Sequence, residues 1–200
     1  MSNNLVCLKS FLPPEVDRYE ILRYARVGGE TSQIRDLLDE CIAEAEKLLT
    51  YQVCYSVYDI DFLENSAELG FACVTSRSLI NVLSASDCNK VVVFCATVGS
   101  GIERLIAKYN IISPARAVFM QALGSERVEA LCDEFCSYIK EEIGGAHTKR
   151  FSPGYGDLPL DLQRNIFDSL ECTKRLGITL NNNLFMTPTK SVTAIIGVKM

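Results

Sequence analysis

The chain has 200 residues, 48% hydrophobic and 22% charged, which is typical of a soluble globular protein with enough apolar side chains for a buried core. Its formal net charge of −5 argues against a nucleic-acid-binding protein, because binding to phosphates requires a basic surface. No apolar run approaches the roughly 18 to 20 residues that span a bilayer, and residues 1–14 lack the basic and apolar regions of a signal peptide. We therefore expect a cytoplasmic protein without a membrane segment, folded as one domain over residues 1–200.

Residues 13–50 are predicted to form a helical N-terminal part. Pro13-Pro14 should open a first helix, with Pro14 near its first position, where the missing N–H is tolerated. That helix should end at Gly28-Gly29. Thr31 or Ser32 can cap a second helix, whose apolar residues recur at i, i+3, i+4 and i+7 from Ile34 to Leu49.

Residues 51–200 mix the two periodicities and should form the core that carries the motifs. Strands are predicted at 51–58, 68–75 and 91–97, with a short helix at 78–84 and a turn at 87–89. The run at 91–97, VVVFCAT, is apolar throughout and is typical of a buried central strand.

The glycines at 99 and 101 end that strand and lead into a helix through about residue 108. The segment at 97–101 resembles a phosphate-binding loop, but it lacks the Gly-Lys-Ser/Thr ending, so a plain strand-to-helix turn is the simpler interpretation.

Ser113-Pro114 should start the longest helix, which ends at Gly144-Gly145. A helix at 160–170 and strands at 178–186 and 191–198 complete the chain. Because helices and strands alternate without βαβ regularity, we predict an α+β fold, a mixed or antiparallel twisted sheet packed with helices.

The nine cysteines do not follow a metal-site or disulfide pattern. There is no C-x-x-C pair, and the closest two, Cys132 and Cys136, lie one helical turn apart. Most fall in apolar runs and are predicted to be buried, reduced thiols, with a metal or iron–sulfur site and a redox role for an exposed cysteine as the alternatives. The single histidine, His147, is expected to be an exposed polar residue.

The segment RFSPGYGD at 150–157 carries the strongest functional signal. Arg150 offers a planar set of donors suited to a carboxylate or phosphate, and Tyr155 offers a flat face and a hydroxyl. Gly154 and Gly156 allow a ligand to approach the main chain. From the residues alone, a tight loop with a solvated arginine is an equal alternative.

This segment resembles the Arg-x-x-x-Gly-Tyr motif of the activation domain of cobalamin-dependent methionine synthase. Arg150, Gly154 and Tyr155 have the required spacing. The later stretch FMTPTKSVTAIIG and the preceding helical stretch ALGSERVEALCDEF also resemble that family, and the segments follow one another in the same order as in the family. The resemblance covers residues 114–197 and points to the short, stand-alone form of the domain.

The resemblance implies an S-adenosylmethionine-binding protein that serves the reductive reactivation of a separate methionine synthase, in methionine biosynthesis. Arg150 would hold the ligand's carboxylate, the backbone at Ser152 and Gly154 would meet the adenosyl group, and Tyr155 would face the cobalamin. Glu129 resembles an acidic residue near the ligand. The partners would be a cobalamin-loaded methyltransferase and a flavodoxin-like electron donor, and the resemblance assigns no catalytic or metal-binding residue to this chain.

Two departures from the family limit the prediction. The chain has Gly156-Asp157-Leu158-Pro159 where larger members continue with Pro-Ala-Cys-Pro, and it lacks the Asp-x-His-x-x-Gly motif, so any cobalamin must come from a partner. The chain is therefore expected to be a component of a methyltransferase system rather than a complete enzyme. The alternatives are a component serving another corrinoid methyltransferase and a non-catalytic module that senses S-adenosylmethionine.

Overall fold

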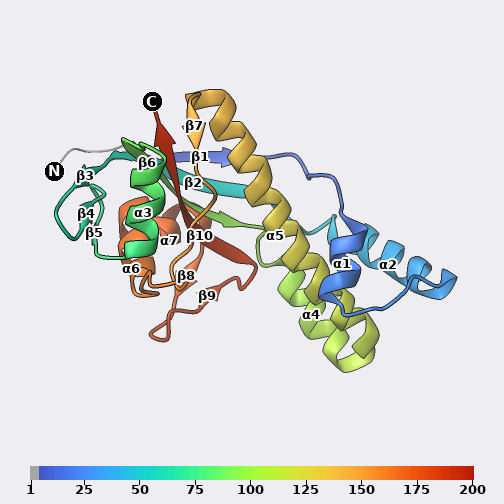
Figure 1. Cartoon of the computed structure of the whole chain (residues 1–200). Helices are drawn as coiled ribbons and strands as arrows, with labels where there is room; N and C mark the ends of the chain where they lie inside the picture. Colours follow the sequence, from blue (N-terminus) through green and yellow to red (C-terminus); the bar gives the residue numbers. More distant parts are fainter. Residues whose placement is uncertain (1–4) are drawn as a thin grey trace.

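A computed structural model describes residues 5–200 and shows an antiparallel five-stranded sheet at the centre of the molecule (Figure 1). The strand order is β1-β2-β6-β10-β7, and every neighbouring pair is antiparallel. The strands are β1 (Cys7–Ser10), β2 (Gln52–Asp59), β6 (Lys90–Thr97), β7 (Ala146–His147) and β10 (Ser191–Lys199). The predicted α+β class is confirmed, and the apolar run at 91–97 is the central strand β6.

Alternating side chains of this sheet enter two separate cores. In β6, Val92 and Phe94 belong to the first core, while Val93 and Cys95 belong to the second. Successive side chains of a strand point to opposite faces of the sheet. Because both faces of β6 are buried in a core, its side chains on both faces need to be apolar.

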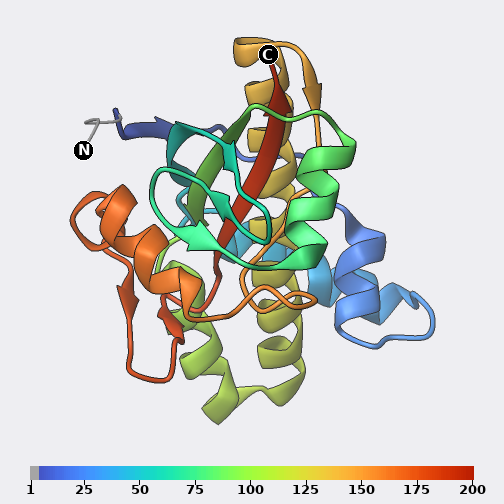
Figure 2. The same cartoon turned by 60° about the vertical axis from the view of Figure 1, so that its left-hand side comes forward.

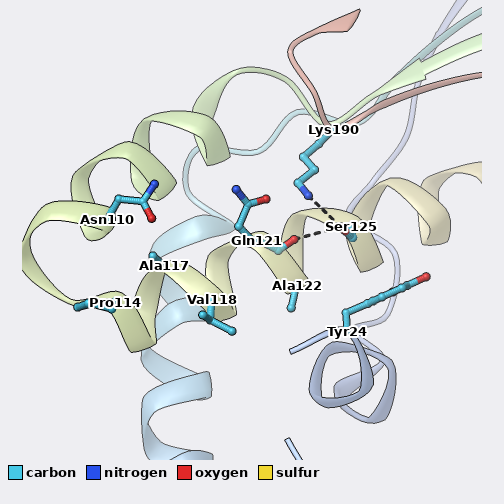
Figure 3. Close-up of a pocket in the computed structure, with 9 residues that line it drawn as sticks. All are labelled: Tyr24, Asn110, Pro114, Ala117, Val118, Gln121, Ala122, Ser125 and Lys190. Atoms are coloured by element: carbon cyan, nitrogen blue, oxygen red, sulfur yellow. Dashed lines mark hydrogen bonds between the residues drawn. The ribbon is translucent and has the colours of Figure 1, made fainter. Parts of the chain in front are cut away.

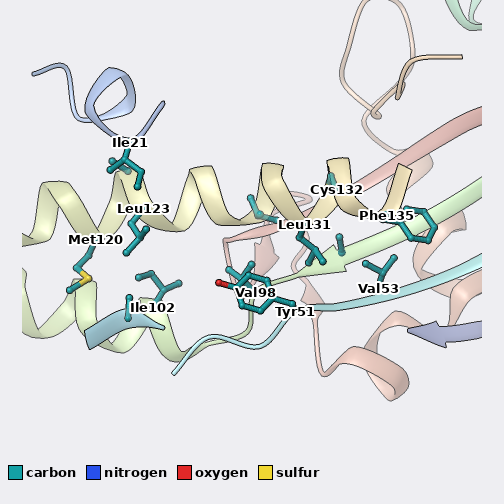
Figure 4. Close-up of a cluster of buried hydrophobic side chains, with 14 of the residues drawn as sticks. Ile21, Tyr51, Val53, Val98, Ile102, Met120, Leu123, Leu131, Cys132 and Phe135 are labelled. Atoms are coloured by element: carbon teal, nitrogen blue, oxygen red, sulfur yellow. The ribbon is translucent and has the colours of Figure 1, made fainter. Parts of the chain in front are cut away.

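Helices divide between the two faces of the sheet (Figures 1 and 2). The first core contains buried residues of α1 (Arg18–Tyr24), α2 (Ser32–Ala45), α4 (Gly101–Ile112) and α5 (Pro114–Ile143). Figure 4 shows its side chains following α5 from Met120 to Phe135. The second core contains residues of α3 (Arg77–Ala85), α6 (Leu162–Leu170) and α7 (Cys172–Leu176).

The predicted start of the first helix at Pro14 is wrong. The helix begins at Arg18, and the Asp17 carboxylate accepts a hydrogen bond of 3.0 Å from the Glu20 N–H. The carbonyls of Pro14 and Glu15 instead accept hydrogen bonds from the buried Arg127, which leaves this segment outside the helix. The expected cap of the next helix is confirmed, because the Thr31 hydroxyl accepts from the Ile34 N–H.

Two predicted strands are shorter than expected. The segment 68–75 turns at Gly70 and contributes to β4 (Ala67–Glu68) and β5 (Cys73–Val74), which join β3 (Asp61–Phe62) in a small sheet. The segment 178–186 is part of a hairpin of β8 (Thr179–Leu180) and β9 (Met186–Thr187), whose turn is closed by the side chain of Asn181. Strand β1 was not predicted at all.

The nine cysteines are free thiols, and six of them are buried. This matches the expectation that most of them fill apolar positions. Within residues 5–200, no helix combines the length and the apolar character needed to cross a membrane.

Candidate functional site

The Arg150 segment is attached to the edge of the main sheet. The backbone N–H and carbonyl of Phe151 each form a 2.9 Å hydrogen bond with Ile195 of β10. Thr148 is fixed in the same way, because its N–H donates to the Gly197 carbonyl and its hydroxyl accepts from the Gly197 N–H. Two points of attachment therefore flank Arg150 on one stretch of backbone.

The guanidinium of Arg150 lies against α5, where it binds two carboxylates. One terminal nitrogen donates to Glu129 at 2.7 Å and the other to Asp133 at 2.5 Å. These acidic residues are four positions apart and therefore lie on the same face of the helix. The Arg150 side chain is largely buried, whereas the side chain of Asp133 is 76% exposed and that of Glu129 is 45% exposed.

The residues after Arg150 form a tight turn. The Tyr155 N–H donates to the Ser152 carbonyl at 3.1 Å, and the Gly154 N–H donates to the Leu158 carbonyl at 2.9 Å. Gly154 and Gly156 have φ angles of +87° and +59°, in the region that favours glycine. The turn leaves Tyr155 68% exposed, with its ring edge-on to that of Phe151.

Asp157 ties this turn to the start of α3. Its carboxylate accepts hydrogen bonds from the Ser76 hydroxyl at 2.5 Å and from the N–H groups of Arg77 at 2.8 Å and Ser78 at 3.2 Å. These hydrogen bonds, above all that from Ser76, lower the pKa of Asp157 to about 2. A carboxylate at a helix N-terminus also compensates the exposed amide dipoles.

An acidic groove of about 460 Å³ includes both Arg150 partners, Glu129 and Asp133, in its lining. Its lining comes from α5, from α1 and from the segment before α1, and seven of its ten residues are acidic: Glu15, Asp17, Glu20, Tyr24, Glu126, Glu129, Ala130, Asp133, Glu134 and Ser137. Because Glu129 and Asp133 both line the groove and bind Arg150, the cation and the groove are adjacent.

A buried ion pair holds the wall of this groove in place. Arg127 is fully buried, and its guanidinium lies 2.5 Å from the Glu126 carboxylate. The guanidinium also donates hydrogen bonds of 2.7 Å to the carbonyls of Pro14 and Glu15. Glu126 also accepts a 3.0 Å hydrogen bond from the Asp17 N–H. The segment before α1 is therefore fixed to α5.

The structure brings the sequence-predicted residues into one region. Arg150 and Glu129 are in direct contact, and Ser152, Gly154 and Tyr155 form the adjoining turn. The sequence did not single out Asp133, although its spacing of four from Glu129 is a signal that could have identified it. The anchoring role of Asp157 was also missed, because its partners lie about 80 residues earlier in the chain.

Comparisons with known proteins support the fold. No protein-family model matches the chain, and no curated protein matches its sequence. Among solved structures, the chain is similar to the crystal structure of the MetH reactivation domain bound to AdoHcy, with a TM-score of 0.70. The similarity covers 96% of this chain and 78% of that one, at 14% sequence identity. The chain therefore shares the fold of a reactivation domain.

Proposed function

We propose that this protein binds S-adenosylmethionine and assists the reductive reactivation of a separate cobalamin-dependent methionine synthase. The observation that carries the proposal is the position of Arg150, which joins the glycine-containing turn to two carboxylates at the edge of the acidic groove. The reactivation-domain fold supports it, because the similar solved structure holds AdoHcy. AdoHcy is S-adenosylmethionine without the methyl group and the positive charge of its sulfonium.

The side chains present match the groups of this ligand. Its carboxylate suits the guanidinium of Arg150, which would exchange its partner Asp133 for the ligand. Its ammonium and sulfonium are both cationic and suit the acidic groove. The turn at Ser152 and Gly154 offers backbone to the adenosyl group, with a conformation at Gly154 that suits a residue without a side chain.

The exposed ring of Tyr155 supports a role at a contact with a second protein. The ring stands on the outer side of the turn rather than in either core. In this proposal the cobalamin belongs to the partner, S-adenosylmethionine supplies the methyl group, and an electron donor such as a flavodoxin supplies the electron. This chain positions the ligand against the partner's cofactor.

Calorimetric titration of the protein with S-adenosylmethionine tests the ligand. We expect saturable binding that Arg150→Ala weakens by about 1.5–3 kcal/mol, the range for a hydrogen bond to a charged group. Decarboxylated S-adenosylmethionine serves as a matched ligand, because it lacks the group that Arg150 would hold. Its affinity should not be lower for Arg150→Ala than for the wild-type protein.

The matched control variant is Arg164→Ala, which removes an exposed arginine of α6 that is away from the groove. It should bind S-adenosylmethionine as the wild type does. An equal loss of affinity for both ligands in Arg150→Ala would contradict the carboxylate role. Binding without reactivation of an added, cobalamin-loaded methionine synthase would favour another corrinoid methyltransferase or a sensing module.

A further inference from the structure

A second pocket lies beside the tip formed by α4 and α5. It has a volume of about 400 Å³ and is separate from the acidic groove except for Tyr24, which lines both. Its walls include the apolar side chains of Ala117 and Val118, and within residues 5–200 Lys190 is the only charged residue that lines it (Figure 3).

Both the backbone and the side chain of Lys190 are held in place. Its backbone carbonyl accepts a 3.2 Å hydrogen bond from the Val98 N–H, just before β10 begins. Its side chain crosses α5 at Gly124, where an added Cβ would lie 3.0 Å from one carbon of the lysine and 3.1 Å from another. The missing side chain at Gly124 therefore makes room for the lysine to reach the pocket.

The ammonium of Lys190 has a neutral partner. It donates to the Ser125 hydroxyl at 2.8 Å, and among residues 5–200 no carboxylate forms an ion pair with it. Burial lowers the pKa of Lys190, and the nearby Glu103 of α4 opposes this change. The Glu103 carboxylate is already hydrogen-bonded to the Thr189 N–H. A partly desolvated cation without a counter-ion gains free energy from an anion that enters the pocket.

We propose that this pocket binds a small monocarboxylate with an apolar body. The carboxylate would bind the Lys190 ammonium, and the apolar body would lie against Ala117 and Val118. A monoanion fits better than a phosphate dianion, because the pocket offers one cation and the acidic groove lies one turn further along α5. This site goes beyond the proposed function, because it does not involve Arg150.

Hexanoate is a suitable probe, with hexanamide as its neutral isostere. In NMR titrations of the full chain, hexanoate should shift the amide signals of residues 117–125 and 190 in a saturable way. Hexanamide should bind at least tenfold more weakly. Lys190→Met keeps most of the stem and removes the charge, and it should weaken hexanoate binding at least tenfold. Lys199→Met, which removes a lysine paired with Asp87 at the opposite end of β10, should have no effect.

A second variant separates loss of the site from loss of the fold. Gly124→Ala favours the helix but crowds both the Lys190 stem and Ile102 of α4, so it should weaken hexanoate binding while α5 stays folded. Equal binding of hexanoate and hexanamide, unchanged binding to Lys190→Met, or no saturable shift would overturn the proposal. Displacement of hexanoate by an equal concentration of inorganic phosphate would also overturn it. Arg150→Ala should leave hexanoate binding intact, so this site and the S-adenosylmethionine site can fail independently.

Discussion

At the scale of single residues, Arg150 has both terminal nitrogens occupied before any ligand binds. Its two partners differ, since Asp133 is more exposed than Glu129 and is therefore more easily displaced. An exposed ion pair is worth about 0–1 kcal/mol, so exchanging Asp133 for a ligand carboxylate costs little. In this proposal Glu129 and Asp133 hold the guanidinium in place for the ligand, and displacing Asp133 lowers the ligand's affinity only slightly.

Asp133→Asn should therefore raise the affinity for S-adenosylmethionine, by up to about fivefold, because a neutral amide holds one nitrogen of Arg150 less tightly than the carboxylate does. Glu134→Gln is the matched control: it removes the same charge from the acidic groove, at a residue that is not bonded to Arg150. Calorimetry on both variants makes the comparison. Weaker binding to Asp133→Asn would show instead that Asp133 contacts a cationic group of the ligand.

Asp157 makes the stability of the protein depend on pH. Its folded pKa of about 2 lies below its value in the unfolded chain, so its contribution is fully present above the unfolded pKa of about 4. That contribution is lost as the pH falls through the folded pKa. In urea denaturation, Asp157→Asn should be less stable than the wild type at pH 7, and the difference should shrink between about pH 4 and pH 2. A difference that stays constant over this range would contradict the assignment.

At the scale of secondary-structure elements, α5 connects the sheet, the acidic groove and the Lys190 pocket. One face of α5 is apolar and packs in the first core. Its polar residues form hydrogen bonds with Arg150 and with the segment before α1. The buried pair of Glu126 and Arg127 joins these regions, because it binds backbone more than 100 residues away in the sequence.

Glu126→Gln should destabilise the protein by about 3–5 kcal/mol, because it leaves the charge of buried Arg127 without its closest counter-ion. Glu20→Gln, which breaks a surface pair with Arg23, should cost less than about 1 kcal/mol. Chemical denaturation measures both changes. A cost below about 1 kcal/mol for Glu126→Gln would show that Glu46, 3.7 Å from Arg127, is a sufficient partner.

Sequence patterns predicted those elements whose signal is local. The apolar run of β6, the capped helix α2 and the proline-started helix α5 were predicted because periodicity and capping residues lie within each segment. The start of α1 was missed because it depends on Arg127, more than 100 residues later. Strand β1 was missed because it is only four residues long and is defined by its pairing with β2.

The candidate site shows the same difference between signals within one segment and contacts between distant segments. The motif identified Arg150 and the turn after it, since these residues are consecutive. The partners of Arg150 on α5 lie 17 and 21 positions away, and only the resemblance to a known family indicated one of them, Glu129. The acidic groove could not be predicted, because it forms only when α1 packs on α5.

At the scale of the whole molecule, both cores depend on the same central strand. Phe94 is fully buried in the first core, while its neighbours Val93 and Cys95 are fully buried in the second. The two cores share the backbone hydrogen bonds of β6 with β2 and β10. Loss of packing on one face should therefore weaken the other face through the sheet.

Phe94→Ala should lower the free energy of unfolding by about 3–5 kcal/mol, the usual cost of removing a buried phenylalanine side chain. Amide hydrogen exchange should show reduced protection in α5, which packs on the mutated face, and also in α6, which packs on the opposite face. Ile111→Ala, at a residue 85% exposed on α4, should change neither. Because the turn of the candidate site is attached to β10, its amide protection should fall together with that of the two cores. Protection that decreases in α5 and is retained in α6 would instead show that the two faces of the sheet unfold separately.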